Sequence, residues 1–199
     1  LALIRYAPEA SVSRMPRSTM RISGGTLKGR TFYPPADNWP TRPTTDFSRT
    51  ALFNILNNRI DFETVSFLDL FGGTGAHSYE MISRGCRQVC YVDKFKPAVH
   101  FVQEKARLWK IEDRMKIVHS DYLVFLRTCS QRFDYIFAGP PYELPKLDEI
   151  PDRVFESGVL AEGVVAAARL AAAAAVGDAG RHSRFQDGLH GVSFVRFSR

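Results

Sequence analysis

The stretch D-L-F-G-G-T-G, Asp69 to Gly75, combines an acidic residue with three glycines where a strand is expected to pass into a helix. Glycines let the backbone turn tightly and approach a ligand closely, and the first N–H groups of a helix are open to polar or anionic groups. A dinucleotide fingerprint would need a third glycine where Ser78 stands, and a Walker-type phosphate loop would need a following Lys-Ser/Thr pair. The pattern therefore indicates either a cofactor with an amino-acid part, whose ammonium meets Asp69 directly or through water, or a turn without a ligand.

Two further carboxylates follow predicted strands. Asp93 closes the run QVCYVD, one strand-helix unit after the glycine turn. A carboxylate at this place accepts both hydroxyls of a ribose in nucleotide-binding α/β folds, although it can also serve as a helix cap. Asp121 follows the next strand and either accepts from an adenine amino group or caps the next helix.

The third motif is FAGPPY, Phe137 to Tyr142. It follows the apolar run FDYIFA, and its prolines end the strand ladder and stiffen the turn. A rigid loop at the end of a strand is typical of a binding site. It raises the question of which group the loop holds, and why Gly139 precedes the prolines.

The elements around these motifs alternate between strand and helix. Hydrophobic patterning predicts strands at 64–70, 88–93, 115–120 and 133–138, with helices at 76–84, 96–110 and 121–129 between them. Short connections between alternating elements predict a parallel sheet covered by helices. Ligands of such sheets bind beyond the carboxyl ends of the strands, which is where the three motifs fall.

The chain has 199 residues and a net charge of +6, and its charge is unevenly distributed. Residues 1–60 carry nine Lys/Arg and three Asp/Glu, whereas residues 61–199 carry eighteen of each. The excess favours either a polyanion-binding arm or a solvated basic tail. No apolar run is long enough for a transmembrane helix, and the first residues do not form a clean signal peptide.

The cysteines indicate no metal site. Cys86, Cys90 and Cys129 are odd in number and lack metal-ligand spacing. Reduced, mostly buried thiols in a cytoplasmic protein are expected.

The N-terminal segment from Met20 predicts a basic hairpin followed by a helix. Strands are expected at 20–23 and 30–33, and Thr45 or Asp46 is suited to cap the helix. Apolar residues at helical spacing predict one buried face, made of Phe47, Ala51, Leu52, Ile55 and Leu56.

The C-terminal part contains an alanine run. Residues 166–175 include eight alanines, and we interpret them either as a helix or as a stretch in which alanine stands for other side chains. Residues 191–197, GVSFVRF, predict a closing strand. An α/β domain of this kind would normally place another apolar strand and a hairpin in this region.

The segment from Met20 to Tyr142 resembles the RsmD-like 16S ribosomal RNA (guanine-N2)-methyltransferases. The resemblance rests on four stretches in order: MRISGGTLKGR, TRPTTDFSRTALFNIL, LDLFGGTGAHSYEMISRG and FAGPPY. It implies a Rossmann-like α/β methyltransferase fold, with a mostly parallel sheet, helices on both faces and a small basic hairpin-and-helix extension. Its implied divisions are an extraneous or disordered extension at 1–19, an RNA-binding appendage at 20–60 and a methyltransferase domain at 61–199.

The resemblance also implies a site and a substrate. S-adenosylmethionine would be the cofactor, and small-subunit ribosomal RNA, free or within an assembling subunit, the partner of a cytoplasmic monomer. The implied cofactor-binding residues are Asp69, Phe71, Gly73, Gly75, Asp93 and Asp121. The implied base-holding residues are Gly139, Pro140, Pro141 and Tyr142. The implied RNA contacts are Arg21, Lys28, Arg30, Arg42 and Arg49. Trp39 or Phe32 would stack on bases; alternatively, Trp39 closes the core.

Gly139 departs from the family pattern, which places Asp or Asn before Pro-Pro-Tyr. A guanine amino group is a poor nucleophile, and hydrogen bonds to a carbonyl and a side-chain oxygen would localise and aim its lone pair. Glycine supplies only the carbonyl. One alternative is an amino-group methyltransferase acting on DNA or protein glutamine, because Pro-Pro-Tyr after an acidic or amide residue also serves those reactions. The missing side chain of Gly139 motivates the other, a cofactor- and RNA-binding module with weak catalysis. A nicotinamide dehydrogenase is disfavoured because the third fingerprint glycine is missing.

Overall fold

The computed structural model describes residues 19–35, 39, 46–141, 144–169, 182–185 and 192–197, with backbone only from residue 162 onward. Its centre is a seven-stranded sheet in the order β5-β4-β3-β6-β7-β9-β8. The strands, in chain order, are β3 Ser66–Leu70, β4 Gln88–Asp93, β5 Met115–His119, β6 Phe133–Ala138, β7 Leu160–Arg169, β8 His182–Phe185 and β9 Val192–Phe197. Strands β3 to β7 run parallel, and β8 and β9 form an antiparallel edge beside β7.

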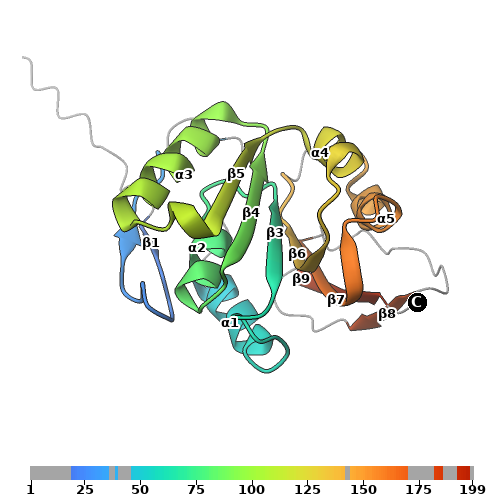
Figure 1. The fold of residues 1–199 in the computed structure, drawn as a ribbon, viewed down its shortest axis with the longest axis horizontal. Helices are drawn as coiled ribbons and strands as arrows, with labels where there is room; N and C mark the ends of the chain where they lie inside the picture. The colour runs from blue at the N-terminus through green and yellow to red at the C-terminus, as the bar shows by residue number, and fades with distance from the viewer. Residues whose placement is uncertain are drawn as a thin grey trace, which may run out of the picture.

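Helices cover both faces of the sheet (Figure 1). They are α1 Asp46–Leu56, α2 Ala76–Ser83, α3 Lys96–Trp109, α4 Tyr122–Thr128 and α5 Ile150–Glu156. Helices α1, α2 and α3 contribute to one hydrophobic cluster, and α4 and α5 contribute to the other. Successive strand residues alternate between the clusters: Phe67 lies in the first and Leu68 in the second, as the pleat requires. The predicted fold class is confirmed.

The N-terminal hairpin is shorter than predicted and shares the core. Strands β1 Met20–Arg21 and β2 Thr31–Phe32 pair antiparallel. Phe32 is only 1% exposed, with its ring against Tyr79 and Trp109. Phe32 is therefore a core residue, and the alternative of base stacking at this position is wrong.

Helix α1 has the predicted position but not the whole predicted face. Leu52 and Leu56 are buried, whereas Phe47 is 68% exposed. Phe53, which lies outside the predicted set, is fully buried and packs against Phe62 and His77. The buried face of the helix is therefore turned away from Phe47.

The C-terminal part completes the sheet. Strand β7 continues through Arg169, so a helix is wrong for residues 166–169. The predicted closing strand is confirmed as β9, and α5 was not predicted. Residues 1–18, Arg42, Tyr142 and residues 170–175 lie outside the described residues.

Candidate functional site

The glycine turn joins β3 to α2, and the neighbouring strand β4 fixes its backbone. The Gly73 N–H donates to Asp93 Oδ2 at 2.8 Å, and the Tyr91 hydroxyl donates to the Gly73 carbonyl at 2.7 Å. The Gly72 N–H donates to the Val92 carbonyl at 3.1 Å. Three hydrogen bonds from one strand therefore hold the turn in a single conformation.

Two glycines of the turn are required by geometry. A Cβ at Gly72 would lie 2.3 Å from the Tyr91 ring, so no side chain fits there. Gly75 has φ of +75° at the N-terminus of α2, and this left-handed conformation favours glycine. Phe71 adopts φ of +60° without being glycine, a strained backbone of the kind found at functional sites.

Helix α2 opens toward this turn without a side-chain cap. The first N–H groups of a helix have no partner within the helix, and its N-terminus carries partial positive charge. The partial charge at this end of α2 suits a carboxylate such as that of an amino-acid moiety. The donors present are therefore suited to the amino-acid part of S-adenosylmethionine.

Asp69 lies beneath the turn and not at its surface. Its carboxylate is 1% exposed and accepts a hydrogen bond from the Ser78 hydroxyl at 2.6 Å. Burial raises the pKa of Asp69 to about 7, against the lowering effect of Ser78 and with a smaller contribution from Asp93. Because the oxygens are buried, Asp69 supports the turn, and an ammonium would reach it only through an intervening group.

Asp93 stands at the carboxyl end of β4 and is half-buried. Its Oδ1 accepts from the Phe95 N–H at 2.8 Å, and its Oδ2 accepts from Gly73. Burial raises the pKa of Asp93, and these N–H donors oppose that shift. A carboxylate has about four acceptor positions, so each oxygen retains one for a ribose hydroxyl.

Asp121 caps a helix. Its Oδ1 accepts from the Leu123 N–H at 2.9 Å at the N-terminus of α4. The capping alternative for Asp121 is thus confirmed. Contact between the second carboxylate oxygen of Asp121 and an adenine amino group stays a prediction.

The loop after β6 lies beside the glycine turn. The Gly139 N–H donates to the Leu70 carbonyl at 3.1 Å, so the ends of β3 and β6 are joined directly. The Pro141 carbonyl accepts from the Leu144 N–H at 3.1 Å. Within the described part of the chain, the carbonyls of Gly139 and Pro140 accept no such hydrogen bond; Gly139 is partly exposed, whereas Pro140 is buried.

Gly139 itself lies outside the left-handed region. A Cβ added here would lie 3.2 Å from Phe137 Cε1 and 3.9 Å from the Phe71 carbonyl oxygen. The position therefore accepts a side chain if the Phe137 ring shifts by a few tenths of an ångström. That ring stacks on His77, with centroids 4.1 Å apart.

The predicted basic residues divide into two groups. Arg21, Lys28 and Arg30 are exposed on the hairpin, and the Arg30 guanidinium lies 6.0 Å from the centre of the Trp109 ring. Arg49 is 1% exposed and donates to Asp46 at 2.8 Å and to the Arg21 carbonyl. Because the Arg49 side chain extends from α1 against the hairpin and is buried there, it is unavailable to a phosphate. Its predicted RNA contact is therefore not supported.

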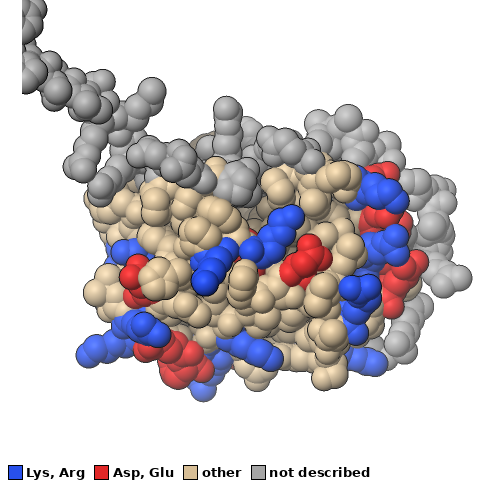
Figure 2. All heavy atoms as spheres, turned by 90° about the horizontal axis from the view of Figure 1, so that it is seen from above, with Lys and Arg blue, Asp and Glu red and all other residues tan. Residues whose placement is uncertain are grey.

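Charge on the side of the molecule seen in Figure 2 is mixed. Both Lys/Arg and Asp/Glu side chains are scattered among the described residues there. Trp39 packs edge-on against Phe95 and Phe101, with centroids 5.9 and 5.6 Å apart, which supports a core-closing role.

Tyr91 and Ser78 are the site residues that the motifs did not identify. Tyr91 holds the Gly73 carbonyl, and Ser78 holds Asp69. Tyr91 precedes Asp93 by two positions, so the two side chains share a face of β4. That alternation is the signal by which Tyr91 could have been found.

The described ranges contain no group of three His, Cys, Asp or Glu side chains able to hold a metal ion. No helix in the same ranges is long and apolar enough to cross a bilayer. Cys86 and Cys90 are buried, and Cys129 is partly exposed.

Solved structures share this architecture. A proposed methyltransferase of Escherichia coli, yhhF, superposes with a TM-score of 0.79 at 20% identity, over 92% of this chain and 99% of that one. A Thermus thermophilus 16S rRNA N2 G1207 methyltransferase, RsmC, in complex with AdoMet and guanosine, superposes with a TM-score of 0.66 at 18% identity, over 92% of this chain and 50% of that one. The chain has a Rossmann-like α/β methyltransferase fold.

The sequence comparisons define the family more closely. Residues 20–180 match the family described as "Conserved hypothetical protein 95", and the chain belongs to this RsmD-like family. YlbH of Bacillus subtilis, named as a proposed rRNA methyltransferase, is 30% identical over 146 residues, covering 72% of this chain and 78% of YlbH. Ribosomal RNA small subunit methyltransferase D of Haemophilus influenzae is 26% identical over 129 residues, covering 63% and 65% of the two chains.

Proposed function

We propose that this protein is an S-adenosylmethionine-dependent methyltransferase that modifies the exocyclic N2 of a guanine in small-subunit ribosomal RNA. The observation that carries the proposal is the direct junction between two loops of different chemistry. The glycine turn, fixed by Tyr91 and Asp93, meets the Gly139–Pro141 loop through the hydrogen bond from Gly139 to Leu70. Family membership and the names of the relatives support the substrate class.

The cofactor end of the site uses residues of β3, β4 and α2. The uncapped N-terminus of α2 receives the carboxylate of the amino-acid part, and Asp93 accepts the ribose hydroxyls. Asp121 accepts from the adenine amino group with the oxygen that does not cap α4. When bound, the cofactor supplies an electrophilic methyl group on a sulfonium sulfur.

The substrate end uses the carbonyls of Gly139 and Pro140. They accept the N–H groups of the guanine amino nitrogen, which turns its lone pair toward the methyl group. The prolines have no N–H and hold the carbonyls in place, and Tyr142 stacks on the base. Transfer would form the N–C bond and break the bond between methyl and sulfur, leaving the cofactor as a neutral thioether, and the amino nitrogen would release one proton to solvent because the side chain at position 139 offers no acceptor.

The test is a labelling experiment with separated substrates. Purified protein and methyl-labelled S-adenosylmethionine are incubated with naked small-subunit RNA, small subunits, DNA and a glutamine-containing protein. We expect label on the RNA of the subunits, recovered as N2-methylguanine. Label on DNA or on protein alone would contradict the proposal.

A second function has one observation in its favour. Because Gly139 provides no side-chain acceptor, the same geometry suits a module that binds cofactor and RNA with weak catalysis. The methyltransferase and the binding module would differ in their turnover and not in their binding of cofactor and RNA. Binding of both ligands without label transfer, even under single-turnover conditions, would favour the module.

A further inference from the structure

A hollow at the end of the sheet opposite the proposed active site gathers positive charge from three connections. Its volume is about 540 Å³, and Arg87, Lys110 and Arg114 line it together with Glu63, Asp113 and Gly85. Arg87 precedes β4, Arg114 precedes β5, and Lys110 follows α3. The amino ends of the strands therefore carry these residues, whereas Asp93 and Gly139 follow the carboxyl ends.

Within the described ranges, the three cations have no direct ion-pair partner. No side chain of Arg87, Lys110 or Arg114 forms a hydrogen bond or ion pair with another residue of the described ranges, although two carboxylates line the same hollow. By contrast, the nearby Arg107 pairs with Glu112, with its Nε 3.7 Å from a carboxylate oxygen. The cations lining the hollow are thus available to an external anion.

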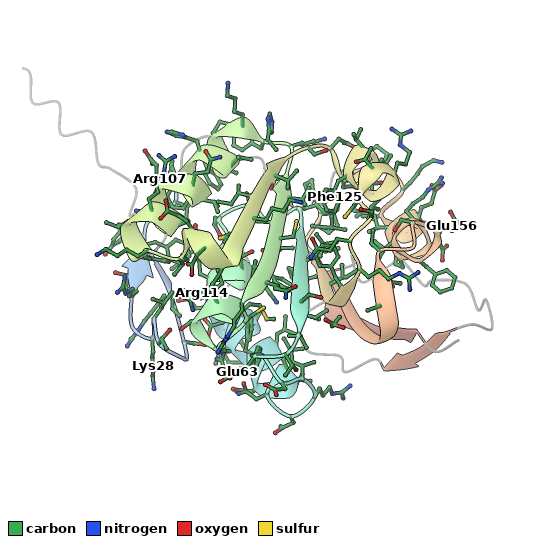
Figure 3. The ribbon with its side chains drawn as sticks, in the orientation of Figure 1. Lys28, Glu63, Arg107, Arg114, Phe125 and Glu156 are labelled. Atoms are coloured by element: carbon green, nitrogen blue, oxygen red, sulfur yellow. The ribbon has the colours of Figure 1, made fainter. Side chains whose placement is uncertain are left out.

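The backbone supports this arrangement of side chains. Lys110 adopts φ of +55° at the C-terminus of α3, where glycine or asparagine is favoured. Gly85 has φ of +119°, and a Cβ there would lie 2.9 Å from Glu63 Cγ. Its missing side chain makes room for Glu63 to lie along the wall of the hollow. Figure 3 shows Glu63 and Arg114 at the lower end of the sheet, with Lys28 of the hairpin on the same side.

The mixture of charges favours one kind of anion. Three cations and two carboxylates give the lining a formal charge of +1, which suits a phosphodiester better than a free phosphate dianion. Carboxylates accept hydrogen bonds from ribose 2′-hydroxyl groups, a contact that DNA cannot make. The Arg30 guanidinium over Trp109, the last residue of α3, continues the positive charge from Lys110 toward the hairpin.

We propose that the hollow lined by Arg87, Lys110 and Arg114 is a docking site for the sugar-phosphate backbone of the substrate RNA, remote from the modified base. This inference rests on the proposed function and specifies how the RNA is held. Strand β4 has six residues at about 3.3 Å each, so the hollow lies about 20 Å from the active site. One folded RNA therefore contacts both ends of the sheet.

The test compares two charge-matched triple variants. Arg87→Gln, Lys110→Gln and Arg114→Gln remove the three cations. The control, Arg127→Gln, Lys146→Gln and Arg153→Gln, removes three cations near α4 and α5, and its Lys146 has φ of +62°, matching Lys110. Cofactor affinity, measured by calorimetry, reports folding in both.

Affinity for purified small-subunit RNA is then measured over a range of salt. The hollow variant is expected to bind at least about tenfold more weakly than the control, and its slope of log affinity against log salt to be smaller by about two to three. Arg87→Lys with Arg114→Lys should retain most of the affinity. Inorganic phosphate alone should not saturate the wild-type hollow at micromolar concentration.

Three results would overturn the inference. Equal RNA affinity and slope in the two triple variants would remove the hollow from the RNA interface. Unchanged RNA affinity with weaker binding to whole subunits would assign the hollow to a ribosomal protein, and micromolar phosphate binding would make it a free-anion site. After any of these three results, methylation of RNA by the wild-type protein would still be expected. Absence of both RNA binding and labelling in the wild type would refute the proposed function itself.

Discussion

Gly139 occupies the position where the two halves of the proposed site touch, and its effect on catalysis follows from what surrounds it. Its N–H donates to the Leu70 carbonyl, and its missing side chain leaves one acceptor fewer than Asp or Asn would provide. A lost charge-assisted hydrogen bond is worth roughly 1.5–3 kcal/mol. The protein is therefore expected to bind its ligands well and to transfer the methyl group slowly.

Gly139→Asp should raise the single-turnover methylation rate by roughly ten- to a hundred-fold, from the same hydrogen-bond magnitude. Backbone strain does not oppose the change because Gly139 is not left-handed, and only the Phe137 ring must give way. Small subunits lacking the modification are the substrate. Gly139→Ala adds the same Cβ without an acceptor and should show no gain; an equal gain in both variants would refute the explanation.

Asp93→Ala should weaken cofactor binding by about tenfold or more, because hydrogen bonds to a charged acceptor are lost. Calorimetric titration with S-adenosylmethionine measures this. Asp93 also holds Gly73, so the matched control is Tyr91→Phe, which removes the other side-chain bond to Gly73 and leaves Asp93 in place. An effect of Tyr91→Phe as large as that of Asp93→Ala would mean that Asp93 acts only through the turn.

Asp69 should make stability depend on pH. Its pKa is raised from 3.8 to about 7 by burial, so between these values the folded state holds a proton that the unfolded state has released. The free energy of unfolding therefore falls as pH rises through this window, by about 2 kcal/mol from pH 5 to pH 7. Urea titrations at several pH values should show that the free energy of unfolding falls less with pH for Asp69→Asn than for the wild type. Equal falls in the two proteins would argue against the raised pKa of Asp69.

At the scale of elements, a network of buried charge joins the hairpin to helices α1 and α2. Glu80 of α2 is fully buried and accepts from the Ser23 N–H at 2.9 Å and from Arg84 at 2.8 Å. Arg49 of α1 approaches it, with its Nε 3.9 Å from the carboxylate. The hairpin is therefore part of the structure that supports α2, whose N-terminus forms one wall of the proposed cofactor site.

Substitutions in the hairpin should separate stability from RNA binding. Phe32→Ala removes a buried aromatic ring and should lower the free energy of unfolding by about 3–5 kcal/mol. Lys28→Ala with Arg30→Ala changes exposed side chains and should leave stability within about 0.5 kcal/mol, while RNA affinity falls. Denaturant titration and gel-shift assays measure the two effects. Unchanged RNA affinity in the double variant would exclude the hairpin from the interface.

The sequence was most informative where the local pattern and the fold agree. The strands that carry Asp69, Asp93 and FDYIFA are alternating or wholly apolar runs bounded by turn residues, and each has its predicted position. Helix α5 was missed because its seven residues include Pro151, which reads as a break although proline suits the first turn of a helix. The burial of Arg49 depends on Glu80 and on the Arg21 carbonyl, which are distant in sequence, so no local pattern shows it.

At the scale of the whole molecule, the two ends of the sheet have different proposed tasks. The carboxyl ends hold cofactor and base, and the amino ends hold a cationic hollow. An RNA that contacts both ends must span about 20 Å. Recognition of shape in addition to sequence is typical of proteins that bind structured RNA.

Small subunits or folded small-subunit RNA should therefore bind more tightly than a short single-stranded oligonucleotide that contains the same guanine. A difference of tenfold or more is expected, since the oligonucleotide loses the remote phosphate contacts. Competition binding at constant salt measures it. Equal affinities would show that all RNA contacts lie around the modified base.

The pairing of β3 also has a consequence for the order in which the chain assembles. Phe67 pairs with Val89 of β4, 22 positions later, and with Tyr135 of β6, 68 positions later. Closing the longer loop costs roughly 1 kcal/mol more in chain entropy, and during synthesis β6 leaves the ribosome well after β4. The glycine turn can thus form before the strand that carries the Gly139–Pro141 loop arrives. A nascent chain that ends before β6 would expose one edge of β3, and a cofactor that binds so early would stabilise a half-built sheet at the time when it is most open to aggregation.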